Sequence, residues 1–395
     1  MKIAILGFTA TSYGSLTYLK NFLPQLAQLD DSNLYEVFLP AERASDLEVR
    51  QPNFRIRLSR IVPRSGALRV LWEQLVLPWI LWSKRMDAVY TAHNMAILLS
   101  PIPSIIAIQN VEPFFADRFP NALQLRPRLW LLRLLTWLSL HRSRKIVAVS
   151  EWERDFLVEC FHVPHSKILV TYHGVTEGFH PPMQDAAVLR ERLGLEQPYI
   201  LCVTRLAGYG NLMNLAKAYA SLVKQGKVAM PLVVPGGVWD SGYMGRVRKV
   251  LAQEGCTGHV RFLGYVPHQH MPLLFGNAEC FVFPSMLEAC GNVLIEALAC
   301  GTPILCCQRR PMTDICGDAA VLFDGEDPGE IADKISQVLS DRSLRNVLSR
   351  RGVARAAQFS WRQGAEKVHK AFEQLNPMCN AANSSGAAIH PERRT

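Results

Sequence analysis

Short apolar runs alternate with amphipathic stretches of helical length through most of the chain. The apolar runs indicate buried strands, and stretches such as 16–29 have the spacing of helices that bury one face. Strands that alternate with helices predict parallel sheets flanked by helices. The strands expected in the first part of the chain are Lys2–Leu6, Tyr35–Leu39, Asp87–Tyr90, Ser104–Ile108, Lys145–Val149 and Lys167–Thr171.

The alternation is interrupted at "HGVTEGFHPP", residues 173–182, where glycine and proline indicate a linker. It then resumes with helices at 212–224 and 244–254, which predicts a second doubly wound domain. Ligands of such sheets bind at the carboxyl ends of the strands, so the expected place for chemistry is a cleft between the two domains. The strands expected in the second domain are Tyr199–Thr204, Pro231–Val234, Val260–Phe262, Cys280–Phe283 and Pro303–Cys306.

Four segments follow from this pattern. We expect an N-terminal domain over 1–175 and a C-terminal domain over 186–358. A helix at 359–375 is expected to pack back on the N-terminal domain. The tail at 376–395 is rich in Ala, Asn, Ser and Gly, which is typical of a disordered segment.

The net charge of +9 raises the question of an anionic partner. Segment 126–145, "RPRLWLLRLLTWLSLHRSRK", has six basic residues, no acidic residue and many Leu and Trp. Two interpretations stay open: a core helix with cationic ends, or a helix that docks on an anionic membrane surface. Segment 71–85 adds three tryptophans and favours the interfacial interpretation. No nucleic-acid-binding module is recognisable, so no nucleic-acid partner is expected.

Several features predict a cytoplasmic protein. The ten cysteines form no CxxC pair and mostly lie in apolar runs, which is typical of reduced, buried thiols. The start "MKIAILGF" lacks the cleavage pattern of a signal peptide and is expected to be the first strand. Arg133 interrupts the best candidate for a membrane-spanning segment. Whether the protein also makes peripheral contact with the cytoplasmic face of the membrane remains open.

Two glutamates stand out in the apolar stretch "SMLEACGNVLIEALACGTPI", residues 285–304. Pro284 ends the preceding strand, so Glu288 is expected on a loop at the carboxyl edge of the sheet. Asn292 is the expected N-cap of the next helix, and Glu296 lies about one turn inside it. Helix-start amides bind phosphate, and carboxylates accept hydrogen bonds from hydroxyls. These features indicate a sugar nucleotide, although two unrelated surface glutamates would look similar.

The longer run "FVFPSMLEACGNVLIEALACGTPI" resembles the signature of retaining glycosyltransferases of family 4, also called group 1. The segments "KIVAVSEWERDFLVECFHVPHSKILVTYHGV", "VRFLGYVPHQHMPLLFGNAECFVFPS" and "DICGDAAVLFDGEDPGEIADKI" are similar to that family in order and spacing. The resemblance covers about 2–372. It implies a GT-B fold: two facing Rossmann-like doubly wound domains with an inter-domain cleft, an acceptor-side N-terminal domain and a donor-binding C-terminal domain.

Carried onto this chain, the resemblance gives roles to the motif residues. Glu288 would contact hydroxyls of the donor sugar, and Glu296 would contact the ribose hydroxyls. Gly291 would let the backbone approach the donor closely. The expected diphosphate contacts are the amides of Asn292, Val293 and Leu294.

The family usually has an arginine and, five residues later, a lysine that together bind the diphosphate. Arg205 matches the arginine, but Gly210 stands at the lysine position. Losing one of two such charges would cost roughly 3 kcal/mol of transition-state stabilisation. Lys217 and Arg309 are candidate replacements.

The N-terminal part supplies further candidates. "GFTATSYGSLTYL" resembles the family's glycine loop, which places Gly14 and Ser15 near the donor phosphate. Gln109, directly after the expected strand Ser104–Ile108, stands where the family often has a histidine. The role of orienting donor or acceptor is then either lost or taken over by Gln109, with Asn110 and Glu112 as nearby polar candidates. For His93, after a strand, and His173, at the domain junction, a structural role and a position at the cleft both remain open.

No metal-ligand cluster and no DxD motif at a strand end is present in the sequence, which predicts a metal-independent reaction. No cofactor is expected, and a nucleoside diphosphate sugar is the expected co-substrate. The sequence therefore predicts a retaining, hexosyltransferase-type enzyme acting on a glycan or lipid-linked acceptor hydroxyl in cell-surface polysaccharide or glycolipid biosynthesis. The alternative, prompted by Gly210 and Gln109, is a catalytically silent GT-B subunit that binds a sugar nucleotide or a partner. A GT-B sugar-nucleotide epimerase matches the stretch around Glu288 poorly.

Overall fold

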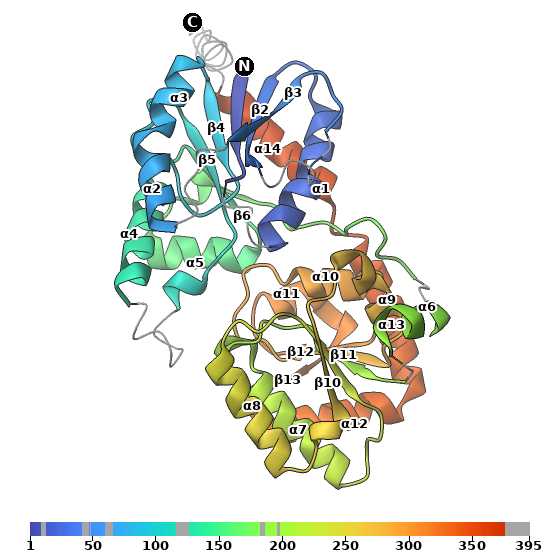
Figure 1. The fold of residues 1–395 in the computed structure, drawn as a ribbon. Coiled ribbons are helices and arrows are strands. Elements are labelled where there is room, and N and C mark those ends of the chain that lie inside the picture. The colour runs from blue at the N-terminus through green and yellow to red at the C-terminus, as the bar shows by residue number, and fades with distance from the viewer. Residues whose placement is uncertain are drawn as a thin grey trace, which may run out of the picture. The chain divides into compact units, whose positions relative to one another are not determined.

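The structure is a computed structural model that describes residues 1–8, 13–41, 47, 49–59, 66–115, 126–181, 186–195 and 198–375. The chain divides into two compact units (Figure 1). Unit 1 contains Met1–Pro113, Pro127–His173 and the segment from Trp361, and unit 2 contains Gly174–Ser360. The expected disordered tail at 376–395 lies outside the described residues.

Unit 1 is built on a seven-stranded sheet in the order β3-β2-β1-β4-β5-β6-β7, in which neighbouring strands are parallel. The strand order reverses between β1 and β4, which is a topological switch point. The strands are β1 Lys2–Leu6, β2 Leu34–Pro40, β3 Phe54–Ser59, β4 Ala88–Thr91, β5 Ser104–Ile108, β6 Lys145–Ala148 and β7 Ile168–Val170. The helices are α1 Tyr13–Leu29, α2 Gly66–Leu75, α3 Leu77–Ser83, α4 Arg126–Arg142, α5 Glu151–Phe161 and α14 Trp361–Leu375.

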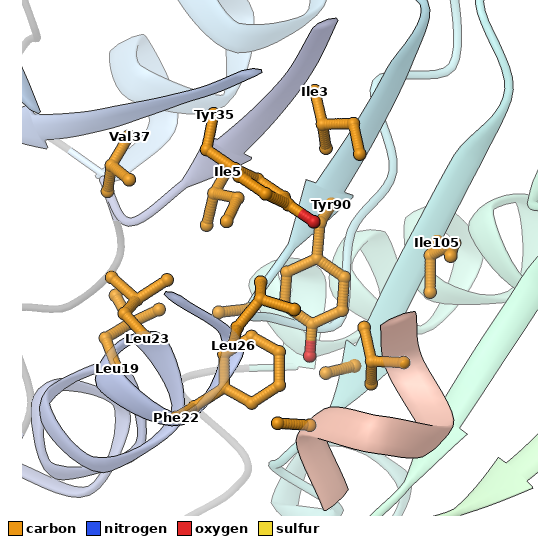
Figure 2. Close-up of a cluster of buried hydrophobic side chains, with 14 of the residues drawn as sticks. Ile3, Ile5, Leu19, Phe22, Leu23, Leu26, Tyr35, Val37, Tyr90 and Ile105 are labelled. Carbon is orange, nitrogen blue, oxygen red and sulfur yellow. The ribbon is translucent and has the colours of Figure 1, made fainter. Parts of the chain in front are cut away.

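The last helix of the described chain belongs to the core of unit 1. In α14, the buried positions recur at helical spacing and pack with α1 and the first strands. Figure 2 shows side chains of α1, including Phe22 and Leu26, directed toward Tyr90 on β4. Because α14 completes this core, removal of the helix would expose the apolar face of α1. The buried α14 residues are Trp361, Gly364, Ala365, Val368, Ala371, Phe372 and Leu375.

Unit 2 has a six-stranded sheet in the order β10-β9-β8-β11-β12-β13, again with parallel neighbours. Its order reverses between β8 and β11, so the loops after these two strands flank the switch point. The strands are β8 Ile200–Leu201, β9 Leu232–Pro235, β10 Val260–Gly264, β11 Cys280–Phe283, β12 Ile304–Cys307 and β13 Ala320–Phe323. The helices are α6 Ala186–Leu193, α7 Leu212–Lys224, α8 Ser241–Gln253, α9 Met271–Gly276, α10 Asn292–Ala299, α11 Met312–Cys316, α12 Pro328–Ser340 and α13 Arg342–Ala356.

The sequence pattern missed two of the four edge strands, β3 and β13, whereas strands were expected at the positions of the other two, β7 and β10. In β3, "FRIRLS", arginines alternate with apolar residues and most of the strand is at least partly exposed. In β13, "AVLF", only the last residue is fully buried. Arginines interrupt the apolar signal of β3, whereas β13 is a continuous apolar run of only four residues. The strand expected over Tyr199–Thr204 was too long, because after β8 the chain turns into the loop that carries Arg205.

Candidate functional site

The loops after β8 and β11 are held together at the carboxyl edge of the unit 2 sheet. The two strands pair directly, with Leu201 beside Phe281. Beyond their ends, the Met286 amide donates a 2.8 Å hydrogen bond to the carbonyl of Tyr209. Arg205 and Glu288 therefore lie on neighbouring loops at the switch point, where open α/β sheets bind ligands.

Glu288 is partly buried in the loop that was expected to carry it. Its Oε1 accepts a 2.9 Å hydrogen bond from the Ser285 hydroxyl. Burial raises the pKa of Glu288 to about 7, although the Ser285 hydrogen bond and the Arg205 charge both lower it. Burial disfavours a charged carboxylate unless polar groups compensate, so this site is poised to gain hydrogen-bond donors such as sugar hydroxyls.

Arg205 is exposed, and two aromatic rings orient its guanidinium group. Its Cζ lies 4.5 Å from the ring centroid of Trp239 and 5.9 Å from that of Tyr209. A parallel bridge between Leu206 and Val238 holds the two loops side by side. The cation is thus kept at the sheet edge, near Glu288, in a position to meet an anion.

Gly210 ends a short 3₁₀ turn, Gly208–Gly210, after Arg205. A Cβ atom at residue 210 would lie 1.9 Å from the Arg205 carbonyl oxygen and 2.8 Å from Thr204 Oγ1. The loop therefore has no room for the lysine that the family resemblance led us to expect. Of the candidate replacements, Lys217 is exposed on α7, and Arg309 makes a 2.6 Å ion pair with Glu326.

Helix α10 begins differently from the sequence expectation. Gly291, with φ of +68°, is the N-cap, and Asn292 is the first helical residue without a side-chain capping bond. The prediction of an Asn292 cap was wrong because a left-handed glycine turns the chain straight into the helix. A Cβ on Gly291 would meet Leu294 Cδ1 at 3.3 Å, which also favours glycine.

The three expected diphosphate amides are at this helix start. Asn292, Val293 and Leu294 form the first turn of α10, and the amides of Asn292 and Val293 stand at the helix start, where no earlier turn supplies acceptors. The Leu294 amide donates a 2.9 Å hydrogen bond to the Gly291 carbonyl. Contact of these amides with a diphosphate stays a prediction.

Glu296 is 5% exposed on α10, so it is not an exposed surface glutamate. Its Oε1 lies 2.8 Å from His268 Nε2. Nothing in the sequence alone distinguishes His268, although it lies within a segment that resembles the family. The two residues are far apart in sequence, and the fold brings them together.

The unit 1 candidates lie at its own sheet edge. Gly14 and Ser15 were expected in a loop, but α1 already starts at Tyr13 and includes both in its first turn. Gln109 follows β5, and its backbone amide donates a 3.0 Å hydrogen bond to Asn94 Oδ1. Its buried side-chain nitrogen Nε2 has no hydrogen-bond partner among the described residues.

The two histidines have packing partners. His93 Nε2 lies 3.7 Å from Glu73 Oε2, a carboxylate that is almost fully buried. His173 is 4% exposed, and its ring stacks on Trp361 at 4.9 Å and lies near Tyr18. For His173, the structure thus favours the packing role over a direct role in chemistry.

The described ranges contain neither a candidate membrane span nor a candidate metal centre. No helix there is both long and apolar enough to cross a membrane. In the same ranges, no group of three or more His, Cys, Asp and Glu side chains is placed to hold a metal ion.

Comparisons with known proteins agree with the fold. A family model described as "Glycosyl transferases group 1" matches 186–355, and one described as "Glycosyltransferase Family 4" matches 14–178. The chain is 32% identical to an O-antigen chain mannosyltransferase B of Escherichia coli over 60% of this chain and 62% of that protein. It is 29% identical to a D-inositol 3-phosphate glycosyltransferase of Corynebacterium jeikeium over 78% of this chain and 69% of that one.

A solved structure extends the comparison to nearly the whole chain. Anabaena HepE in complex with UDP and glucose superposes with a TM-score of 0.72 at 16% identity, over 95% of this chain and all of HepE. At this identity the likeness concerns the fold. The expected fold class, a GT-B protein with two Rossmann-like domains, is confirmed.

Proposed function

This chain belongs to the group 1 glycosyltransferase family, and we propose that it transfers a sugar, with retention, from a nucleoside diphosphate sugar to a hydroxyl of a glycan or lipid-linked acceptor at a membrane surface. The observation that carries the proposal is the convergence of Arg205, Glu288 and the start of α10 at the β8–β11 switch point. Cell-surface polysaccharide or glycolipid biosynthesis is the expected setting.

Each group has one task in the proposed reaction. The bond between the anomeric carbon and the diphosphate oxygen breaks, and Arg205 with the first amides of α10 stabilises the departing charge. The acceptor oxygen bonds to the anomeric carbon on the same face, and the acceptor proton passes to a diphosphate oxygen. Glu288 holds hydroxyls of the donor sugar, Glu296 holds the ribose, and Gln109 orients the reactants. Neither a protein nucleophile nor a metal ion takes part.

Hydroxyl binding also explains why a carboxylate with a raised pKa suits this place. Donated hydrogen bonds favour the ionised form of Glu288 and offset the burial that disfavours it. The donor hydroxyls therefore add polar partners to the Ser285 hydroxyl and the charge of Arg205.

The experiment is a measurement of nucleoside diphosphate release from UDP-, GDP-, ADP- and dTDP-sugars. We expect release with one donor class, and a rate at least about 100-fold lower in Arg205→Ala, as when one preorganised charge donor is removed. Arg248→Ala is the matched control. Arg248 is an exposed arginine on α8, and its guanidinium group lies over the ring of Phe262 on β10. Equal rates in Arg205→Ala and the native protein would refute the proposed role of Arg205.

The silent-subunit alternative is favoured by the tight packing of Gly210, which leaves Arg205 without the family's second cation. The same measurement separates the two functions. The protein would be the silent subunit if it binds a nucleoside diphosphate but releases no nucleoside diphosphate from any sugar donor in the presence of acceptor glycans.

The membrane part of the proposal rests on α4, a helix that exposes large apolar side chains and buries small polar ones. Its small polar residues Thr136 and Ser139 are buried, as is Ser143 directly after its end, while several large apolar residues of the helix face outward. Leu140 of the same helix is buried in a hydrophobic cluster, so α4 contributes to the core on one side and exposes Leu and Trp side chains on the other. The outward residues are Trp130, Leu131, Leu134 and Trp137, which are 65%, 53%, 53% and 43% exposed.

Helices α2 and α3 add to the same apolar surface. Ala96 links α2 to α4, because its carbonyl accepts from Gln74 Nε2 and its amide donates to Ser139 Oγ, each at 2.9 Å. Exposed arginines flank the apolar surface and suit anionic headgroups. The exposed apolar residues of α2 and α3 are Leu68, Leu71, Leu75, Trp79 and Trp82, and the arginines are Arg85, Arg142 and Arg144.

Cosedimentation with phosphatidylglycerol and phosphatidylcholine vesicles tests this surface. We expect binding to the anionic vesicles that weakens with salt and is lost in the double variant Trp130→Ser, Trp137→Ser. The control is Trp239→Ser in unit 2, because Trp239 is 66% exposed but lies outside the surface. No binding to anionic vesicles at moderate salt would refute the membrane contact and leave the transfer reaction untouched.

A further inference from the structure

Glu296 has a neighbour whose role the reaction above does not explain. His268 comes from the 3₁₀ turn His268–His270, which follows β10, whereas Glu296 lies on α10 after β11. His268 Nε2 is 2.8 Å from Glu296 Oε1, and the side chains are 40% and 7% exposed, respectively. The imidazole thus reaches from the protein surface to an almost buried carboxylate.

The imidazole is itself held from the other side. The His268 ring lies 5.1 Å from the ring of Phe179, and Phe179 packs against Phe275 at 6.3 Å. Phe179 is 5% exposed, so this packing is part of the unit 2 interior. The aromatic contact and the hydrogen bond together restrict His268 to one orientation.

We propose that His268 is a positioning residue for ribose recognition: it holds Oε1 of Glu296 and leaves Oε2 to accept hydrogen bonds from the ribose hydroxyls of the donor. The inference rests on the proposed function of Glu296. An ionised carboxylate can accept several hydrogen bonds, so occupation of Oε1 leaves capacity on Oε2. A glutamate fixed before binding loses less rotamer freedom when the nucleotide arrives.

Specificity for ribose is the property that this arrangement predicts. A site that is built to hydrogen-bond a hydroxyl rejects an analogue without that hydroxyl, because its polar group is then left unpaired. If His268 were needed only to neutralise a buried charge, its removal would weaken the fold and leave the preference for ribose unchanged.

The test compares binding of UDP, GDP and ADP with their 2′-deoxy and 3′-deoxy analogues by calorimetry. The variants are Glu296→Ala, His268→Ala and His268→Gln, with His270→Ala as the control from the same turn. We expect Glu296→Ala to abolish the preference for the ribonucleotide. His268→Ala should lower ribonucleotide affinity about tenfold, a typical effect of losing one hydrogen bond to a charged group. It should leave the deoxy analogue nearly unaffected.

His268→Gln should restore most of the preference, since its side-chain amide can donate to Oε1, and it supplies a folded variant if the alanine variant unfolds. A preference that survives in both His268 variants but disappears in Glu296→Ala would overturn the role of His268 alone. A preference that survives in Glu296→Ala would instead overturn the proposed ribose contact, and the inference with it.

Discussion

Glu288 makes the stability of this protein depend on pH in a direction that can be calculated. Its pKa is raised from 4.5 to about 7 by burial. Between these two pH values the folded state holds a proton that the unfolded state has released, so the free energy of unfolding falls as pH rises. The shift corresponds to about 3 kcal/mol, and partial exposure of the loop reduces the expected effect to about 2 kcal/mol.

The perturbation is Glu288→Gln, which cannot ionise and can still accept the Ser285 hydrogen bond through its amide oxygen. Urea unfolding at pH 5 and pH 8 gives the free energy of unfolding of both proteins. The glutamine variant should gain about 2 kcal/mol relative to the native protein between pH 5 and pH 8.

Glu191→Gln, at an exposed position on α6, controls for the loss of one negative charge. The reasoning about burial would be refuted if the Glu288→Gln difference stayed constant with pH, or if the native protein became the more stable of the two at pH 8.

Three further predictions concern the loops of unit 2. Gly210→Ala should lower the free energy of unfolding by about 2 kcal/mol, because its Cβ would overlap the Arg205 carbonyl. Gly237→Ala is the control: a Cβ there would lie in open space, so the free energy of unfolding should change little in the same urea assay. Gly291→Ala should cost about 1–2 kcal/mol, because residue 291 has a left-handed backbone; an alanine variant as stable as the native protein would mean that the chain enters α10 in another way. Trp239→Ala should weaken nucleotide diphosphate binding about threefold through the lost contact with Arg205, and Trp239→Phe should recover part of it in calorimetric titrations.

The central strands and the main helices follow from the sequence because burial on both faces leaves a continuous apolar signal. The bounds of β1, β5, β11 and α7 agree with the expectation. The loop at 285–291 was also predicted, since Pro284 and the polar residues after it end the strand. Of the four edge strands, β3 was missed because arginines alternate with its apolar residues, and β13 was missed as an apolar run of only four residues.

The site was predictable only where a role depends on local sequence. Arg205, Glu288 and Glu296 were singled out by their spacing and family resemblance, and their roles stay predictions. The pairing of Glu296 with His268 was not, because it depends on a contact across 28 positions of the chain. Likewise, the sequence showed that a lysine is replaced at Gly210, but only the structure shows that the Arg205 carbonyl occupies the place of a side chain.

The proposed transfer reaction requires a nucleoside diphosphate site beside α10 in unit 2. Thermal unfolding with UDP, GDP, ADP and dTDP sugars tests it directly in the native protein and in Glu296→Ala. One nucleotide class at a hundredfold excess over its Kd should stabilise the native protein by about 2.7 kcal/mol. The account predicts that this stabilisation disappears in Glu296→Ala. Stabilisation of equal size in both proteins would place the nucleotide elsewhere and contradict the account.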